Sequence, residues 1–236
     1  MISIIIPTLN EAARLSLLLA ELRAETEAHE IIVVDGGSGD GSAAVARDHG
    51  ADRVLTAPRG RGPQLVAGAD AASGEVLLFL HGDSRFPRGG LTALRRELAE
   101  HPEAHGGNFS LLFDGDDGFS RWLEEFYAGI RARGFYYGDS GIFVRRWAYD
   151  VLGGLRPLAL MEDYDFVRRL ERAGPTLCIA EPPLVTSSRR FGGRSKSNIV
   201  LGWIKIHLLY HLRLPGALLA RLYDSERRVE TKGVMS

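Results

Sequence analysis

Short apolar runs alternate with segments of helical periodicity along the first hundred residues. Nearly unbroken apolar runs of this kind are typical of strands buried on both faces of a parallel sheet. Strands that alternate with helices predict an α/β fold with a mostly parallel, doubly wound sheet. The predicted strands are Ile2–Ile6, ended by Pro7, then Ile31–Val34, Arg53–Thr56 and Val76–Leu80. The predicted helices are Arg14–Arg23, with Asn10 as its N-cap, then Gly41–His49 and the later part of 60–72.

Beyond Pro87 the alternation weakens, and we interpret the second half as additional elements built onto the same sheet. No linker rich in proline, glycine or serine separates two domains. The predicted strands are Asn108–Phe113, Ile142–Val144 and Thr176–Ala180, and the predicted helices are Leu91–Glu100, Phe119–Arg133 and Asp163–Ala173.

The segment Asn198–Leu214 is strongly apolar and ends at Pro215. It is shorter than the roughly 20 apolar residues of a membrane span, and it carries Lys205 and Arg213. Two interpretations stay open. One is a buried or dimer-forming helix, and the other is a helix that lies in a membrane interface with its basic residues at the headgroups.

The composition narrows the class of protein. A net charge of −1 provides no global field that would recruit nucleic acid. The single cysteine, Cys178, excludes an intramolecular disulfide and a multi-cysteine metal cluster. The first residues lack the basic segment and cleavage site of a signal peptide, so we expect a cytoplasmic protein. Contact with the inner face of the membrane would come from the 198–214 helix.

Polar residues follow the first two predicted strands. Pro7, Thr8 and Glu11 come after the first strand, and Asp35 ends the run IIVVD. Ligands of open α/β sheets bind beyond the carboxyl ends of the strands, so these residues are expected to line one crevice. Asp35 would accept hydrogen bonds there from the ribose or base of a nucleotide. The alternative is a turn aspartate that caps its own glycine-rich loop.

Three arginine-containing or glycine-rich loops are candidates for phosphate binding. The loop 36–41 lacks the Lys-Ser/Thr ending of a P-loop and the glycine spacing of a dinucleotide site, which excludes both classes. Arg59 and Arg61 precede a helix and would grip a diphosphate with planar guanidinium groups. Arg189 and Arg190, with Arg194, would fold over a leaving diphosphate as a lid. A solvated basic loop is the alternative for both arginine groups.

Asp83 follows the strand VLLFL in the sequence His81-Gly82-Asp83. A carboxylate at such a strand end can hold Mg²⁺ or Mn²⁺ against a diphosphate, because these ions often need only one or two carboxylates besides the phosphates. His81 would join the ligands of Mn²⁺ or orient Asp83. The alternative is an ordinary Asp-Ser turn.

An acidic run, Glu162-Asp163-Tyr164-Asp165, opens a predicted helix. The helix dipole stabilises acids in a first turn, which is a purely structural explanation. Three acids within four residues exceed what capping requires. We predict Asp163 as a general base for a hydroxyl acceptor, with Glu162 orienting it or contacting the acceptor.

Together, ISIIIPTLNEA, IIVVDGGSGDGS, the aspartate after LLFLH and the late MED resemble family 2 glycosyltransferases of the GT-A fold. The stretches GRGPQLVAGADAASGEVLLFLHGDS, GDSGIFVRR and PLALMEDYDFVRRL are similar to small bacterial transferases associated with radical-SAM and selenium-domain proteins. Some members of that group are named for arsenosugar biosynthesis. The resemblance covers about residues 2–214 and is far more specific for the fold than for the sugar.

The resemblance implies inverting transfer of a sugar from a UDP- or GDP-linked donor to a hydroxyl acceptor. His81 replaces the first aspartate of the family's Asp-x-Asp motif, which removes one carboxylate and puts metal dependence in question. The implied donor-binding residues are Pro7, Thr8, Glu11, Asp35, Arg61, Gln64, His81, Gly82, Arg189 and Arg190. Asp83 would bind Mn²⁺ or Mg²⁺, Asp163 and Glu162 would be catalytic, and Gly138, Asp139 and Ser140 would lie on the acceptor side.

The implied organisation is a GT-A catalytic domain at 1–197, with a donor half at about 1–100 and an acceptor half at about 101–197. A C-terminal apolar helix and tail follow at 198–236. Two alternatives to a transferase remain. The first is a nucleotide-sugar-binding protein that lost catalysis through His81. The second is a sugar-phosphate nucleotidyltransferase, which needs a basic glycine-rich loop after its first strand, whereas this loop is acidic.

Overall fold

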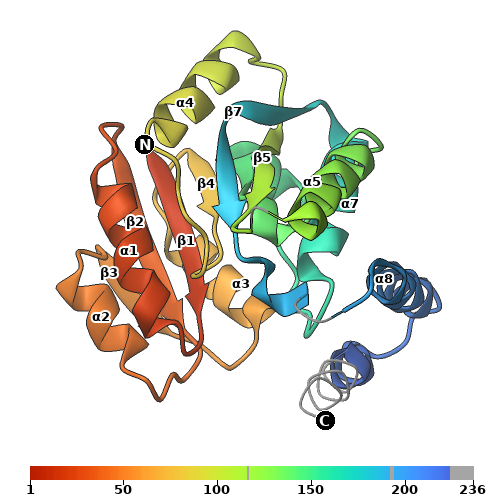
Figure 1. Ribbon diagram of the computed structural model, residues 1–236. Coiled ribbons are helices and arrows are strands. Elements are labelled where there is room, and N and C mark those ends of the chain that lie inside the picture. Colours follow the sequence, from red (N-terminus) through yellow and green to blue (C-terminus); the bar gives the residue numbers. More distant parts are fainter. Residues whose placement is uncertain (116, 192–193, 224–236) are drawn as a thin grey trace.

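A seven-stranded sheet forms the centre of the protein in the computed structural model, which describes residues 1–115, 117–191 and 194–223 (Figure 1). The strand order is β3-β2-β1-β4-β6-β5-β7. Strand β6 is antiparallel to both β4 and β5, and the other neighbouring strand pairs are parallel. This confirms the predicted mostly parallel α/β sheet. The strands are β1 (Ile2–Thr8), β2 (His29–Asp35), β3 (Arg53–Thr56), β4 (Val76–Phe79), β5 (Gly106–Phe113), β6 (Ile142–Arg145) and β7 (Thr176–Thr186).

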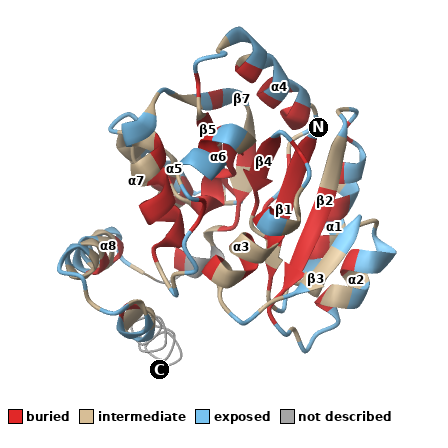
Figure 2. Cartoon of the chain, turned by 180° about the vertical axis from the view of Figure 1, so that it is seen from behind, coloured by how far each residue is buried: buried red, intermediate tan, exposed pale blue. Residues whose placement is uncertain are grey.

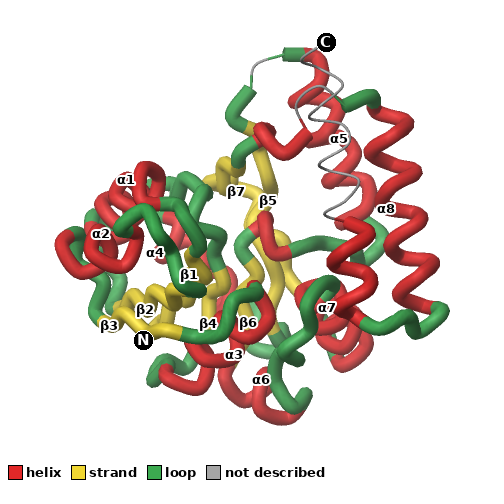
Figure 3. Tube along the Cα trace, turned by 90° about the horizontal axis from the view of Figure 1, so that it is seen from below, coloured by secondary structure: helices red, strands yellow, loops and turns green. Residues whose placement is uncertain are grey.

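Helices cover both faces of this sheet (Figures 1 and 3). Successive side chains of a strand point to opposite faces. Ile4 and Ile6 therefore pack in a core with α1, α2, α4 and α5, whereas Ile5 packs in a second core with α3, α6 and α7. The helices are α1 (Ala12–Arg23), α2 (Ser42–Asp48), α3 (Arg61–Ala71), α4 (Gly90–Glu100), α5 (Gly118–Arg131), α6 (Arg146–Val151), α7 (Glu162–Ala173) and α8 (Lys196–His211), with short turns η1 (Gly138–Ser140) and η2 (Ser188–Phe191).

Strand β1 continues through Pro7 to Thr8, so the prediction that Pro7 ends the strand is wrong. The Thr8 carbonyl faces β2, where it accepts a hydrogen bond from the Gly36 N–H at 2.9 Å. The nitrogen of the preceding Pro7 therefore faces the β4 side. Because β4 ends opposite Ile5, no strand requires an N–H from Pro7. A proline is tolerated at such an edge position.

The prediction of Asn10 as the N-cap of α1 is also wrong. Helix α1 begins at Ala12, and the Ala12 N–H donates to the Asp40 carboxylate at 2.9 Å. Asn10 has a φ of 56°, in the left-handed region that asparagine tolerates. Its side chain accepts a hydrogen bond from the Gly39 N–H at 2.9 Å. The glycine-rich loop after β2 therefore supplies the contacts that start α1.

Helix α8 packs beside α7 and stands apart from the sheet (Figure 3). Ile199 and Ile206 are its buried side chains, and much of the rest is exposed or intermediate (Figure 2). The interpretation of 198–214 as a buried helix is therefore wrong for most of its length, whereas the dimer-forming and membrane-interface interpretations stay predictions. A helical segment at 216–223 follows α8. Among the residues that the structure describes, no helix combines the length and apolar character needed to traverse a bilayer.

Candidate active site

A cavity of about 550 Å³ opens at the carboxyl ends of β1 and β4. This size is typical of small-molecule sites, which span about 300–1,000 Å³. Its position is where open α/β sheets bind their ligands. The start of α3, the start of α7 and the inner face of α8 complete its walls. The lining residues are Pro7, Leu9, Glu11, Arg59, Gly60, Arg61, Gln64, His81, Gly82, Asp83, Tyr127, Tyr137, Asp139, Ala159, Leu160, Met161, Glu162, Asp163, Trp203, Ile206, His207, Ala220 and Tyr223.

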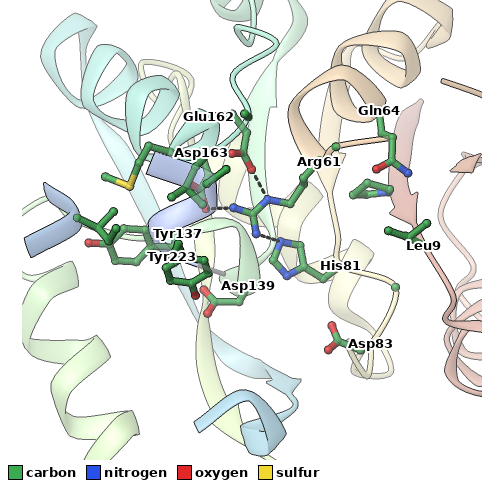
Figure 4. A pocket seen from close by; sticks show the side chains of 18 of the residues that line it. Leu9, Arg61, Gln64, His81, Asp83, Tyr137, Asp139, Glu162, Asp163 and Tyr223 are labelled. Carbon is green, nitrogen blue, oxygen red and sulfur yellow. Dashed lines mark hydrogen bonds and ion pairs between the residues drawn. The ribbon is translucent and has the colours of Figure 1, made fainter. Parts of the chain in front are cut away.

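Arg61, in the first turn of α3, lies among the charged groups of this cavity (Figure 4). Its Nε atom forms a close ion pair with Glu162, and its Nη2 atom lies 3.3 Å from Asp163 Oδ2. Its Nη1 atom lies 3.5 Å from His81 Nε2. Burial alone would lower the pKa of Arg61, but the charges of Glu162 and Asp163 outweigh it and raise that pKa. The guanidinium therefore stays charged and joins α3 to the acids of α7.

The two predicted catalytic acids occupy different environments. Glu162 is 1% exposed, and burial raises its pKa although the positive charge of Arg61 opposes this. Asp163 is held by backbone donors. Its Oδ2 atom accepts from the Gly138 N–H at 2.9 Å, and its Oδ1 atom accepts from the Tyr164 N–H at 2.7 Å. Glu162 is therefore engaged by an ion pair, while Asp163 is oriented by the main chain at the cavity wall.

Met161 precedes these acids and has a φ of 69°, a conformation that the sequence did not predict. A bulky residue in the left-handed region is uncommon and costs about 1–3 kcal/mol. Its carbonyl accepts the Asp165 N–H at 2.9 Å, which closes the first turn of α7. No sequence signal marks this conformation, because glycine or asparagine is the usual residue there. The strained residue turns the chain so that α7 begins at the cavity.

Gly138 brings the predicted acceptor-side turn against Asp163. A Cβ atom at this position would lie 2.8 Å from His81 Nε2 and 3.3 Å from Asp163 Oδ2. Asp139 also lines the cavity, and its carboxylate accepts from the Tyr127 hydroxyl at 2.9 Å. Ser140 lies behind the cavity lining and donates its hydroxyl to the Tyr137 carbonyl at 2.7 Å. The acceptor-side role of the three residues stays a prediction.

Some of the predicted donor-binding residues line the cavity, and others support the residues that line it. Pro7, Glu11 and Gly82 line the cavity. Thr8 is buried beneath it, and its carbonyl accepts from the Gln64 side-chain amide at 2.8 Å. The same amide nitrogen donates to the Val34 carbonyl at 2.7 Å. Gln64 therefore ties the ends of β1 and β2 together in addition to lining the cavity.

Asp35 acts in part as the turn aspartate of the alternative interpretation. Its Oδ2 atom accepts from the Gly37 and Ser38 N–H groups, each at 3.0 Å. Its Oδ1 atom is buried and has no hydrogen-bond partner among the described residues. Asp35 does not line the cavity with its neighbours. One oxygen thus supports the loop, and the other is an unused acceptor at the end of β2.

Asp83 lines the cavity on the side opposite α7 (Figure 4). The His81 ring nitrogen Nε2 faces Arg61. Among the described residues, no three histidine, cysteine, aspartate or glutamate side chains form a cluster that could hold a metal ion. A single carboxylate such as Asp83 fits Mn²⁺ or Mg²⁺ only as an ion that shares the oxygens of a bound diphosphate.

Aromatic residues form much of the remaining wall, and sequence reasoning missed them. Trp203 and His207 lie one turn apart on α8, and Tyr127 and Tyr137 face them. The Tyr137 hydroxyl donates to His207 Nε2 at 2.9 Å, because His207 Nδ1 donates to the Trp203 carbonyl at 2.7 Å. Burial raises the pKa of Tyr137 and lowers that of His207. The i, i+4 spacing of Trp203 and His207 was the sequence signal that places both side chains on one side of α8.

The predicted arginine lid is only partly described. Arg189 and Arg190 lie in η2, but their side chains fall outside the described part of the structure. Arg194 is described and does not line the cavity. The lid therefore stays a prediction.

A doubly wound sheet with a cavity at its strand ends and an acid at the start of α7 is the arrangement expected of a GT-A glycosyltransferase. Residues 3–150 match the description "Glycosyl transferase family 2". The chain therefore belongs to glycosyl transferase family 2.

Curated relatives match part of the chain. A glycosyltransferase of Mycobacterium tuberculosis strain H37Rv is 33% identical over 97 residues, which make up 41% of this chain and 43% of that relative. The undecaprenyl-phosphate 4-deoxy-4-formamido-L-arabinose transferase of Aeromonas hydrophila is 31% identical over 98 residues, or 37% of this chain and 30% of that enzyme. The matched segments thus span less than half the length of these relatives.

Solved structures show the same fold. The mannosyltransferase PcManGT of Pyrobaculum calidifontis, in complex with GDP-Man and Mn²⁺, has a TM-score of 0.65 at 17% identity and covers 94% of this chain and 68% of its own. TarS of S. aureus, in complex with UDP-GlcNAc, has a TM-score of 0.64 at 17% identity and covers 80% of this chain and 58% of its own. The GT-A fold is therefore confirmed.

Proposed function

We propose that this protein is an inverting glycosyltransferase that moves a sugar from a UDP- or GDP-linked donor to a hydroxyl acceptor. The observation that carries the proposal is the placement of Asp163, a buried carboxylate held by two backbone N–H groups at the wall of the cavity. The bound UDP-GlcNAc of TarS and GDP-Man of PcManGT support a nucleotide-sugar donor. Assignment to the arsenosugar-type subgroup rests on the motifs alone.

In the proposed reaction, Asp163 takes the proton of the acceptor hydroxyl while the oxygen attacks the anomeric carbon. The bond from that carbon to the diphosphate breaks on the opposite face, and the nucleoside diphosphate leaves with the electron pair. The configuration therefore inverts. Arg61 fixes the positions of Glu162 and Asp163. Arg59 and Arg61 also place positive charge in the cavity, where preorganised charge stabilises the leaving group.

Two further residues would contact the donor. Asp83 would hold Mn²⁺ or Mg²⁺ together with diphosphate oxygens, and the ion would add positive charge at the leaving group. The Mn²⁺ in the complex of PcManGT supports this assignment. Asp35 lies beside the described cavity, at the end of β2, and its unused Oδ1 atom would accept a hydrogen bond from a nucleoside that extends beyond the cavity to this strand end.

Replacement of Asp163 by asparagine tests the proposal. Donors are first selected from a panel of nucleotide sugars by thermal shift, and transfer or donor hydrolysis is then measured. Asp163→Asn should bind the donor normally and lose turnover by a factor on the order of 10²–10⁴, the range for removal of a general base. Asp70→Asn, an exposed aspartate on α3, is the matched control. Turnover at the wild-type rate in Asp163→Asn would remove Asp163 from the role of base.

The same assay separates the alternatives. A protein that binds nucleotide sugars without transfer or hydrolysis would be a binding protein that lost catalysis through His81. Release of pyrophosphate from a nucleoside triphosphate and a sugar phosphate would indicate a nucleotidyltransferase. The acidic loop around Glu11 disfavours the latter, because an incoming triphosphate needs positive charge there.

A further inference from the structure

The outer face of α8 carries an apolar stripe. Leu201, Ile204, Leu208 and Leu212 are 62%, 58%, 58% and 63% exposed. Spacings of three and four residues place side chains on one side of a helix. The buried residues of α8, Ile199 and Ile206, lie on the opposite side, where Ile206 packs with Tyr164 of α7 and Ile199 packs in the first core. The stripe therefore faces away from the rest of the molecule.

This stripe concentrates the exposed apolar surface of the protein. The described residues include ten exposed large hydrophobic side chains, and five of them lie in 196–223. Of the other five, Met1, Leu17 and Leu112 lie apart from one another, and Trp147 and Val151 form a pair on α6, so none of these groups is as large as the stripe. Scattered apolar residues are normal on a surface, whereas a contiguous group marks an interaction site.

The described segment that carries the stripe has charged residues of one sign. Residues 196–223 contain Lys196, Lys205, Arg213 and Arg221 and no aspartate or glutamate, although the whole chain has a net charge of −1. All four basic residues are exposed. A second copy of the chain would bring an equally basic segment against this one, and like charges would repel. An anionic lipid surface complements both the stripe and its charges.

We propose that the outer face of α8 docks the protein on an anionic lipid bilayer. The stripe would lie at the boundary between headgroups and acyl chains, and the lysines and arginines would contact the phosphates. Helix α8 has 16 residues, so it would lie along the interface for about 24 Å. This inference concerns binding alone and does not depend on the proposed reaction.

The inner face of the same helix connects the lipid surface to the cavity. Trp203, Ile206 and His207 line the cavity from α8. Hydrogen bonds from Tyr210 to Asp165 and between Tyr164 and His211, each of 3.0 Å, hold α8 against α7. The cavity therefore lies within one helix diameter, about 10 Å, of the proposed lipid contact. If the proposed function holds, an acceptor anchored in lipid reaches Asp163 without leaving the bilayer.

Vesicle flotation with the full chain tests the docking. Wild type should float with vesicles of equal parts phosphatidylcholine and phosphatidylglycerol, less with pure phosphatidylcholine, and less at high salt. Leu201→Ser/Leu208→Ser should weaken binding by at least about tenfold, because two exposed leucines leave the interface. Leu17→Ser/Val151→Ser is the matched control and should bind as wild type. Circular dichroism verifies that each variant is folded.

A second pair of variants separates charge from apolar contact. Lys205→Gln/Arg213→Gln should lose the preference for phosphatidylglycerol, while Arg47→Gln/Arg88→Gln, on other elements, should keep it. Flotation of Leu201→Ser/Leu208→Ser equal to wild type would overturn the proposal. The proposal would also be overturned if wild type were a dimer, the Leu201→Ser/Leu208→Ser variant were a monomer, and neither protein floated with vesicles. Neither outcome involves turnover, so a failure of the proposed transferase activity is distinguishable.

Discussion

Arg61 determines how two carboxylates coexist at the start of one helix. Glu162 is almost fully buried, and Asp163 is 6% exposed. Two adjacent buried acids repel each other, and the charge of Arg61 offsets this repulsion because its guanidinium contacts both. The side chain of Arg61 remains 32% exposed, so part of its interaction is screened by water.

Replacement of Arg61 should therefore destabilise the fold as well as reduce activity. Arg61→Ala leaves Glu162 buried without its partner and should lower the free energy of unfolding by on the order of 2 kcal/mol. This is less than the roughly 3–5 kcal/mol for a fully buried pair, because Arg61 is partly exposed. Urea unfolding measures the loss. Arg59→Ala, in the loop that precedes α3, should change stability little. Adding Glu162→Gln to Arg61→Ala should recover part of the lost stability.

Gly138 offers a second test at the residue scale. A Cβ atom at Gly138 would crowd His81 Nε2 at 2.8 Å, so Gly138→Ala should lower the melting temperature and turnover. The loss of stability should shrink in a His81→Ala background, because the crowded ring is gone. Gly39→Ala is the control, since no atom lies within 4 Å of a Cβ there. Equal losses in both backgrounds would contradict the contact between Gly138 and His81.

The candidate site was predictable to the extent that acids follow apolar runs. Asp83 stands at such a position, whereas Asp163 was predicted from the acidic run that opens a helix, and both line one cavity. The partners of these acids were not predictable. Arg61 contacts Glu162 across 101 positions of sequence, and the left-handed conformation of Met161 has no local signal. Contacts between distant segments depend on packing that a local pattern does not encode.

At the element scale, the interface between α8 and the rest of the protein contains a titratable side chain, His207. Burial lowers the pKa of His207 below the ordinary value of 6.5, so the folded protein favours the neutral ring. As the pH falls, the unfolded chain takes up the proton first. The stability that His207 contributes is therefore fully present above about pH 6.5 and is lost as the pH falls through its folded pKa.

This predicts that His207→Asn reduces the pH dependence of stability. Between about pH 7.5 and pH 5.5, the interval in which histidine titrates, the melting temperature of wild type should fall further than that of the variant. His101→Asn is the control, because His101 is on the surface with 45% of its side chain exposed. Burial raises the pKa of Glu162, so its contribution to stability increases as the pH falls. This contribution is the same in wild type and in both variants. The same decrease in wild type and His207→Asn would refute the assignment.

The elements themselves were predicted best where a strand is buried on both faces. β1, β2 and β4 contain nearly unbroken apolar runs, because helices cover both sides of the sheet. β7 was predicted only to Ala180, whereas it continues through Pro182 and Pro183 to Thr186. A shift of register between Phe109 and Leu111 of β5 accommodates this irregular stretch. Prolines normally indicate a turn, and only the partner strand reveals that the pairing continues.

At the scale of the whole molecule, one sheet joins the two predicted halves. β6 comes from the second half and pairs with β4 of the first. Asp83 and Asp163 therefore belong to different halves and line the same cavity without an intervening hinge. Binding at either wall should stabilise the entire fold, because unfolding of one half disrupts the shared sheet.

Nucleoside diphosphate binding should therefore raise the melting temperature of the chain as a whole. A ligand at 100 times its Kd stabilises by about 2.7 kcal/mol, or roughly 5–11 °C for a domain of this size. Differential scanning fluorimetry with UDP and GDP, with Mn²⁺ or with EDTA, measures the shift. Asp83→Asn should lose only the part that depends on Mn²⁺, whereas Asp35→Asn should lose stabilisation under both conditions. An unchanged Mn²⁺-dependent shift in Asp83→Asn would mean that another group holds the ion, and Asp70→Asn controls for the removal of one negative charge.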